Sequence, residues 1–460
     1  MIEDKQPSPF LTTIRAKLGG NSLDAIIARG ASGTFFVDGL GQGLVFGAQI
    51  LLARLMGAEH YGVYAYVLAW VTLLFLLARL GMDTMLLRYI ATYRANHEWG
   101  LMRGVVQMSN LWGLVSSLVV GSITAGIVWF WRESLGEPLA YAFWAGCGLL
   151  PFFVLSGLCQ SSLNGIKKVV LAQLPNRLIR QTLLVLLVMG GVWLIGIEMT
   201  GATAILLTIV AVLGGYGIGV YWLWRHLPEG YWSAKPIYRN REWLLTAFPL
   251  MLAAGAYMLT QKTDTLMIGA MLGTTDAGIY AVASRIAEFT SFGLTAATAI
   301  AAPHMSEFFS QKKRTELQRV VSLTTWGAIA FSIPFAVVVV VLGTWLLSLF
   351  GSAFTLGYWA LVLLVAGQVA NTVTGPIGVL MNMTGHQNHL LIILVGALVL
   401  NAILNYFFIL SMGIAGAALA TALVKVGWNV VAVSFVYRKF GINCFAFHEI
   451  LGSQSGMRSQ

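Results

Sequence analysis

The stretch Ala53–Tyr66, ARLMGAEHYGVYAY, returns in altered form at Gly269–Val282 as GAMLGTTDAGIYAV. Aligned without gaps, the two phrases share four positions: Gly57 with Gly273, Gly62 with Gly278, Tyr64 with Tyr280, and Ala65 with Ala281. Each phrase joins two long apolar segments, and their separation is close to half the chain. A membrane protein built from two similar helical halves usually holds a substrate between them, so the repeat favours a transporter.

The composition indicates a membrane protein. Hydrophobic residues make up 58% of it and charged residues only 10%, which leaves too little polar surface for a soluble globule. Apolar runs of about 20 residues recur, each long enough to cross about 30 Å of hydrocarbon as a helix. The sequence therefore predicts an all-α polytopic membrane protein with about twelve transmembrane helices in two six-helix lobes. The predicted spans are 33–56, 61–82, 104–131, 139–161, 169–196, 201–224, 244–272, 277–301, 319–346, 357–383, 389–412 and 414–437.

These spans divide the chain into five parts. We expect a cytoplasmic N-terminal segment at 1–32, an N-lobe at 33–224, a cytoplasmic inter-lobe linker at 225–243, a C-lobe at 244–438 and a cytoplasmic tail at 439–460. Residues 1–32 lack the short apolar core and cleavage motif of a secretory signal, so we expect the first span to direct insertion.

The distribution of charge predicts the orientation. With residues 1–32 inside, the inner segments collect most of the Lys and Arg residues, whereas the outer loops hold mainly acids. The outer acids are Glu59, Glu133, Glu137, Glu198 and Asp276, beside Arg54 and Arg132. This asymmetry follows the positive-inside rule and places both termini in the cytoplasm. The net charge of +10 is scattered over short loops, so it gives no support to nucleic-acid binding.

Several ionisable residues fall inside predicted spans. An ionised side chain near the membrane midplane costs about 2.5–3.5 kcal/mol on insertion scales, so each needs a partner or a function. The cations are Arg177, Arg180, Lys262, Arg285 and Lys425, and the acids are Asp38, Asp264 and Glu288. Because cations outnumber acids, a hydrated cavity lined by these residues favours an anionic substrate. We therefore take the five cations as candidate substrate-binding residues. The three acids are candidate sites for a coupling ion.

Structural roles compete with these functional ones. Arg285 and Glu288 are i,i+3 neighbours and suit a mutual ion pair. Arg177 is placed to extend its guanidinium to the interface. Lys262 and Asp264 point to different helix faces, which argues against a direct pair unless the segment unwinds.

Motifs for enzymatic chemistry are weak or missing. The sequence has no Walker loop and no zincin motif, and the loops are too short for a folded extramembrane domain. Cys147, Cys159 and Cys444 suggest no disulfide framework. We therefore expect no catalytic residues, no metal site and no cofactor beyond a coupling Na⁺ or H⁺, and we expect that the protein is not an enzyme.

Two phrases carry a family resemblance: Leu51–Tyr66, LLARLMGAEHYGVYAY, and Asp264–Phe289, DTLMIGAMLGTTDAGIYAVASRIAEF. They resemble hallmark segments of the multidrug/oligosaccharidyl-lipid/polysaccharide (MOP) flippase superfamily, and most closely its polysaccharide-transporter branch, the Wzx-type oligosaccharide flippases. The resemblance covers nearly the whole chain, because span number, repeat order and both phrases agree.

The resemblance implies a V of two lobes with alternating access, driven by an ion gradient. It implies that the substrate is an oligosaccharide on polyprenyl pyrophosphate, moved across the bacterial cytoplasmic (inner) membrane for O-antigen, capsule or exopolysaccharide synthesis. In such relatives cavity cations meet the pyrophosphate, and Arg177, Arg180, Lys262, Arg285 and Lys425 are the candidates here. The expected partners are this substrate and membrane lipids, with a polysaccharide polymerase and a chain-length regulator as further candidates.

Three alternatives stay open at this stage. A MATE-type multidrug or cation antiporter is disfavoured by the surplus of deep cations, although Asp38 argues for it. A fourteen-helix lipid II flippase is disfavoured because no pair of spans follows residue 438. A membrane polymerase or glycosyltransferase is disfavoured because the chain lacks a large outer loop and an Asp-x-Asp pair.

Overall fold

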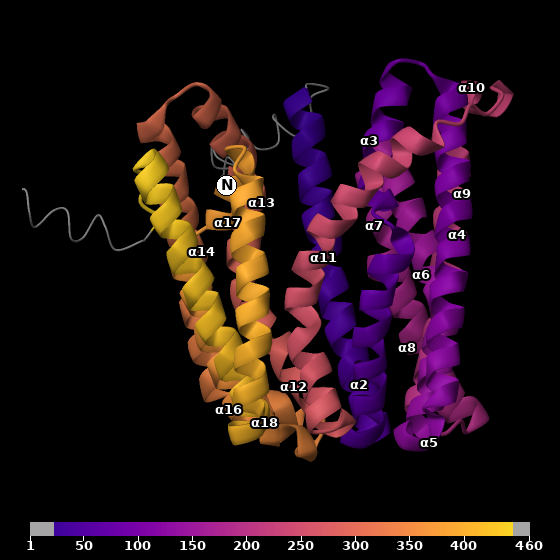
Figure 1. Ribbon diagram of the computed structural model, residues 1–460, viewed down its shortest axis with the longest axis vertical. Coiled ribbons are helices and arrows are strands. Elements are labelled where there is room, and N and C mark those ends of the chain that lie inside the picture. Colours follow the sequence, from indigo (N-terminus) through magenta and orange to yellow (C-terminus); the bar gives the residue numbers. More distant parts are fainter. Residues whose placement is uncertain (1–22, 445–460) are drawn as a thin grey trace, which may run out of the picture.

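The computed structural model describes residues 23–444, except for the side chains of 23–36, 38, 252–254, 256 and 257. Within this range the regular secondary structure is helical (Figure 1). The predicted N-terminal segment, 1–32, and the predicted tail, 439–460, lie largely outside the described residues. The side chain of Asp38 also lies outside them.

The first half of the chain forms a run of helices that matches the six predicted spans. Its elements are α2 (Leu23–Arg79), α3 (Met82–Ala95), α4 (Trp99–Phe130), α5 (Arg132–Leu135), α6 (Glu137–Gly165), α7 (Val169–Leu174), the π-helix η1 (Pro175–Ile179), α8 (Arg180–Gly190), the π-helix η2 (Gly191–Ile195), α9 (Gly201–His226) and α10 (Glu229–Ser233).

The second half repeats the pattern. Its elements are α11 (Asn240–Met271), α12 (Thr274–Glu288), the 3₁₀ turn η3 (Phe289–Ser291), α13 (Phe292–Ser310), α14 (Arg314–Val341), α15 (Gly343–Ser348), the 3₁₀ segment η4 (Ser352–Gly357), α16 (Tyr358–Val373), α17 (Ile377–Met383) and α18 (Gln387–Phe440).

Two long helices each contain two predicted spans. The chain reverses inside α2 at Gly57, where φ is 67°, and inside α18 at Gly413, where φ is 62°. Glycine adopts this left-handed region without the steric cost that a Cβ brings. Eight described helical segments are long and apolar enough to cross a membrane, and the two that contain Gly57 and Gly413 are among them. The predicted multi-pass, all-α membrane fold is confirmed.

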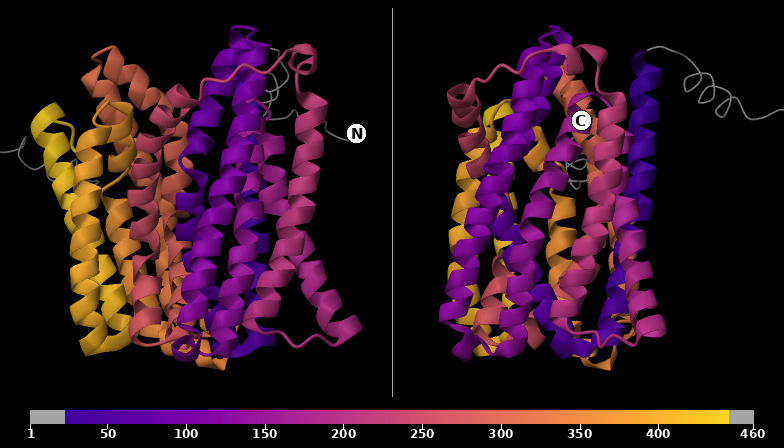
Figure 2. Two further views of the ribbon diagram at one scale, coloured as in Figure 1. Left: turned by 45° about the vertical axis from the view of Figure 1, so that its right-hand side comes forward. Right: turned by 90° about the vertical axis from the view of Figure 1, so that its right-hand side faces the viewer.

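The helices form two bundles that meet at one end and separate at the other (Figure 1). We call them the N-lobe and the C-lobe and keep 33–224 and 244–438 as their proposed limits. The end where they meet, near α5 and the start of α12, is called the closed end, and the opposite end is called the open end. Both views in Figure 2 show the linker from α10 to α11 crossing the open end.

The repeated phrase is the contact that joins the lobes at the closed end. A Cβ placed on Gly62 would lie 2.2 Å from the carbonyl oxygen of Thr274, and one on Gly278 would lie 2.5 Å from the Cα of Gly62. A Cβ on Gly269 would lie 2.2 Å from the ring of Tyr66. The glycines of the two phrases therefore allow α2 and α12 to approach backbone to backbone, as small residues do in membrane helix packing.

Side chains extend the closed end beyond the glycines. The Nε of Arg54 in the N-lobe donates to the carbonyl oxygen of Leu349 in the C-lobe at 2.6 Å. The ring centres of Phe46 and Phe350 lie 5.3 Å apart, and those of Tyr61 and Phe354 lie 5.6 Å apart. Phe350 and Phe354 are fully buried, so the segment from the end of α15 into η4 fills this end of the space between the lobes.

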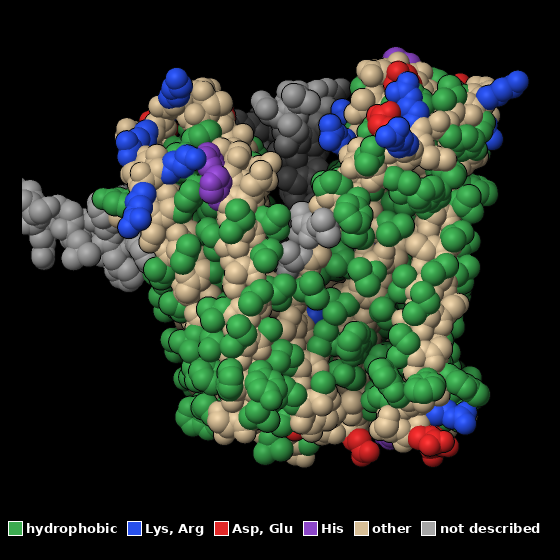
Figure 3. All heavy atoms as spheres, viewed as in Figure 1, with side chains coloured by type: hydrophobic (Ala, Val, Ile, Leu, Met, Phe, Trp, Pro, Cys, Tyr) green, Lys and Arg blue, Asp and Glu red, His purple; other side chains and the backbone are tan. Residues whose placement is uncertain are grey.

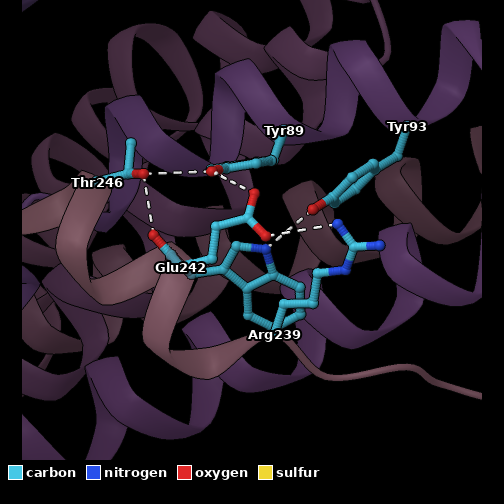
Figure 4. Close-up of polar contacts among 6 residues, drawn as sticks. Tyr89, Tyr93, Arg239, Glu242 and Thr246 are labelled. Carbon is cyan, nitrogen blue, oxygen red and sulfur yellow. Dashed lines mark hydrogen bonds and ion pairs between the residues drawn. The ribbon is translucent and has the colours of Figure 1, made fainter.

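At the open end, α11 is attached to the N-lobe by a polar contact with α3 (Figure 4). The hydroxyl of Tyr89 donates to Glu242 at 3.0 Å, and the Nε1 of Trp243 donates to the hydroxyl of Tyr93 at 3.0 Å. Arg239 pairs with Glu242 at 3.5 Å. The later part of α11 contacts α12 and α18 of the C-lobe through Asp264, and it also packs against α2 of the N-lobe. This helix therefore contacts both lobes.

Charge separates the two ends in the way that the sequence predicts. In Figure 3, Lys and Arg side chains gather on the open end of both lobes, while Asp and Glu dominate the closed end on this face. If the positive-inside rule holds here, the open end faces the cytoplasm.

We predict that Gly62→Ala destabilises the fold, because its Cβ has no space beside the Thr274 carbonyl. Overpacking of this kind costs about 1–3 kcal/mol, which a thermal unfolding assay in detergent would detect. The matched control is Gly126→Ala on α4, where no atom lies within 4 Å of the new Cβ. The control is expected to keep or raise the stability, because alanine favours helix. Equal stability of both variants would contradict the close contact.

Candidate functional site

The cations of the N-lobe sit on a broken helix. Pro175 has no N–H, and the helix widens there into the π turn η1, in which the N–H of Arg180 bonds to the carbonyl of Pro175. Arg177 lies inside this wide turn and Arg180 starts the next helix. π turns inside α-helices occur frequently at functional sites. The break places two guanidinium groups within four residues of each other at the middle of the membrane-spanning segment.

Neighbouring helices hold this turn in place. A Cβ on Gly41 of α2 would lie 3.0 Å from the Cβ of Arg177, so α2 packs directly on η1. Asn176 accepts a hydrogen bond from Ser156 at 2.8 Å and donates to Gln160 at 2.9 Å, which ties η1 to α6.

Arg180 contacts an aromatic ring of the N-lobe. Its guanidinium carbon lies 5.5 Å from the ring centre of Phe153 on α6, a cation–π contact. In the part of the chain that the structure describes, no carboxylate forms an ion pair with it. A half-buried arginine stacked on a ring keeps most of its donors available for an anion.

In the C-lobe, Arg285 has partners on both sides. Its Nη1 pairs with Glu288 at 3.1 Å, as the i,i+3 spacing predicts, and its Nη2 donates to the Oε1 of Gln42 at 3.0 Å. Gln42 belongs to α2 of the N-lobe, so Arg285 bridges the lobes. Lys262 lies on α11, half-buried, and forms no ion pair with Asp264 among the described residues.

Asp264 is the centre of a buried polar network. Its Oδ1 accepts from the Nδ2 of Asn405 at 2.8 Å, and its Oδ2 accepts from Tyr280 at 2.6 Å and from Thr421. Asn401 joins the network by donating to Thr421 at 3.1 Å and accepting from Asn405 at 3.0 Å. The carbonyl oxygen of the Asn405 side chain is buried without a partner. Hydrogen-bond donors from α12 and α18 therefore converge on one buried carboxylate of α11, which is 8% exposed.

A cavity of about 580 Å³ opens beside this network, among α11, α12, α13, α16, α17 and α18. We call it the C-lobe cavity. Asp264, Glu288 and Lys425 line it, together with the amides of Gln368 and Asn371 and the indole of Trp428. The half-buried ammonium of Lys425 forms no ion pair among the described residues. Two acids and one base of the predicted set line this cavity, and the other predicted cations lie outside its lining.

The structure thus separates the predicted site residues into groups. Arg177 and Arg180 lie in the N-lobe, Arg285 lies between the lobes with Glu288, and Asp264, Glu288 and Lys425 share the C-lobe cavity. Their binding roles stay predictions. Sequence reasoning missed four further residues: Tyr280, Asn401, Asn405 and Thr421. The sequence contains two signals that could have identified some of these residues. Tyr280 belongs to the repeated phrase, and the two asparagines stand one turn apart in an apolar span.

Comparison with known proteins agrees with this architecture. A solved structure of an inward-facing multidrug resistance MATE family transporter of the MOP superfamily aligns with 89% of this chain and 98% of its own, at a TM-score of 0.73 and 14% identity. Lipid II flippase MurJ in an inward closed conformation aligns with 88% of this chain and 87% of its own, at a TM-score of 0.68 and 15% identity. At such identities these likenesses establish the fold alone.

The sequence comparisons define the family. The family model described as "Polysaccharide biosynthesis protein" matches residues 27–309, more than half of the chain, and the MatE model matches 249–407. The chain belongs to the polysaccharide biosynthesis protein family of the MOP flippase superfamily. A probable low-salt glycan biosynthesis flippase of Haloferax volcanii is 28% identical over 192 residues, which cover 41% of this chain. The match spans only 40% of that relative's length.

Proposed function

We propose that this protein flips polyprenyl-pyrophosphate-linked oligosaccharide from the cytoplasmic to the outer leaflet of the inner membrane, for O-antigen, capsule or exopolysaccharide synthesis. The observation that carries the proposal is the broken helix of the N-lobe, which presents Arg180 without a carboxylate partner among the described residues. The family match and the glycan flippase relative support the same substrate class. A transporter of this kind is not an enzyme.

The physical reason is the cost of desolvation. A diphosphate and a chain of sugars cannot cross hydrocarbon, because each unsatisfied polar group costs several kcal/mol there. Guanidinium groups replace the lost water with charge-assisted hydrogen bonds to phosphate oxygens. Arg177 and Arg180 thus form the first docking point for the headgroup, and the polyprenyl tail stays in the surrounding lipid.

Alternating access follows from the arrangement of the lobes. The closed end is sealed by backbone contacts at Gly62 and Gly278 and by the bond from Arg54 to Leu349. The open end carries the basic loops, so in this state the substrate site faces the cytoplasm, with both termini on the same side. Approach of the lobes at the open end and separation of these closed-end contacts would open the outer side.

The coupling ion is best placed at Asp264. Its carboxylate is buried among neutral donors, and the free oxygen of Asn405 lies in the same network, so a proton or Na⁺ there changes the charge of the lobe interior. Glu288 is already paired with Arg285, which makes it the weaker candidate. Binding that differs between two states shifts their equilibrium, and this links the ion gradient to the cycle. Asp38 stays a third candidate.

One specific observation favours a second function. The C-lobe cavity carries Asp264 and Glu288, and acidic cavities suit the organic cations that a multidrug antiporter expels. Ethidium efflux from cells that express the protein, in the absence of glycan export, would support this alternative. A lipid II flippase would instead move the peptidoglycan precursor in the proteoliposome flipping assay of the next paragraph.

We predict that Arg180→Ala lowers the flipping rate of lipid-linked oligosaccharide in proteoliposomes by at least about tenfold, because a charge-assisted hydrogen bond contributes about 1.5–3 kcal/mol. Lys425→Ala is expected to lower it as well. The control is Arg132→Ala, which removes an exposed arginine stacked on Trp129 at the closed end and leaves the rate unchanged. Normal flipping by Arg180→Ala protein that is present in normal amount would refute the assigned role.

We predict that Asp264→Asn abolishes the response of flipping to an imposed ion gradient, because an amide binds neither a proton nor Na⁺ as a carboxylate does. Flipping would be followed in proteoliposomes with a pH gradient or a Na⁺ gradient, which also identifies the ion. Glu288→Gln is the matched control and should retain the gradient response. A gradient response that survives Asp264→Asn and disappears in Glu288→Gln would transfer the role to Glu288.

A further inference from the structure

The C-lobe cavity contains polar groups that neither docking of the diphosphate nor ion coupling uses. Gln368 of α16 lines it and is only 8% exposed, yet its side-chain amide forms no hydrogen bond within the described part of the structure. The amide atoms of Gln368 face the cavity, where water or a polar ligand can reach them. An unpartnered amide that faces a cavity of about 580 Å³ points to a polar guest.

Asn371 lies one helical turn from Gln368 on the same cavity wall. Its Oδ1 accepts a hydrogen bond from the Nδ2 of Asn429 at 3.0 Å, which fixes the orientation of the amide. The amide nitrogen of Asn371 donates no hydrogen bond among the described residues, so its N–H donors stay available beside the cavity. The two side chains together present donors and an acceptor on one face of α16, the pattern that hydroxyl groups complement.

An aromatic ring completes the wall on the other side. Trp428 of α18 lines the cavity, half-buried, three residues from Lys425. An indole offers a flat apolar face and one N–H donor, which match the C–H face and the hydroxyl edge of a pyranose ring. Amides beside an exposed ring face form a surface suited to a carbohydrate.

The charge of the cavity argues against the diphosphate as its guest. Among the lining residues Asp264 balances the ammonium of Lys425, and Glu288 is already paired with Arg285, so the cavity has no surplus of cations for a group with two or more negative charges. A neutral sugar needs no such surplus. The N-lobe shows the opposite balance, because Arg180 has no acidic partner among the described residues.

We propose that the C-lobe cavity is the compartment for the sugar residues of the substrate, and that Gln368, Asn371 and Trp428 select the glycan. This inference rests on the proposed function and deepens it. The diphosphate binds to the N-lobe arginines while the sugars reach across to the C-lobe, so one substrate spans both lobes. Glycan selection and headgroup binding then depend on different residues.

The test compares two substrates in proteoliposomes. The first is lipid-linked oligosaccharide extracted from the source organism, and the second is the same material trimmed enzymatically to its first sugar. Gln368→Leu and Trp428→Leu are expected to slow flipping of the intact oligosaccharide by about tenfold and of the trimmed carrier by less than about twofold. Arg180→Ala should slow both. The controls are Gln387→Leu and Trp359→Leu, which change exposed side chains of the same two helices outside the cavity.

The outcomes separate the two proposals. If the cavity variants slow both substrates equally, or neither, the sugar compartment is wrong and the flippase function stands. If wild-type protein moves neither substrate, the proposed function fails and the compartment fails with it. A thermal unfolding scan of each variant identifies loss of folding, and Gln368→Glu gives a second variant that keeps a polar side chain and should restore part of the intact-substrate rate.

Discussion

The structure depends on one steric constraint, the backbone contact between the two repeated phrases at the closed end. Gly62 and Gly278 bring α2 and α12 closer than any side chain allows. Arg54 and a few aromatic rings add to this contact, while α11 ties the lobes together at the open end. In the proposed cycle the contact separates when the outer side opens, and the small residues at its centre have no long side chains to disengage. The repeat thus closes this end of the molecule and is also evidence of duplication.

The two lobes share a fold but differ in charge. The N-lobe presents arginines on a broken helix, whereas the C-lobe encloses Asp264, Glu288 and Lys425 around a polar cavity. Such asymmetry suits a substrate with a strongly anionic end and a neutral, hydroxylated end. It also leaves the carboxylate of Asp264 free to carry a cation without competing for the phosphates. One pseudo-symmetric scaffold therefore supports two separate recognition tasks.

The sequence predicted the local features well and the long-range ones poorly. Span positions follow from apolar run length, and breaks at Gly57 and Pro175 follow from residues that stop a regular helix. The ionisable residues inside the spans were identified from the sequence, because an ionised side chain in hydrocarbon has a large free-energy cost. Their grouping was not predictable, because Asn405 meets Asp264 across more than a hundred residues of chain. The π turn was also not predicted. A proline in a helix leaves one backbone carbonyl without its usual N–H donor, and the sequence does not specify which other donor that carbonyl accepts from.

Distances between spin labels test the central claim, that the glycine contact opens as the opposite end closes, most directly. With the native cysteines replaced by serine, one pair at Lys168 and Lys312 reports on the open end, and one pair at Glu133 and Ser352 reports on the closed end; all four are exposed. On addition of lipid-linked oligosaccharide and the coupling ion in nanodiscs, the account predicts a shorter distance for the first pair and a longer distance for the second. Unchanged distributions for both pairs, with substrate bound, would contradict it.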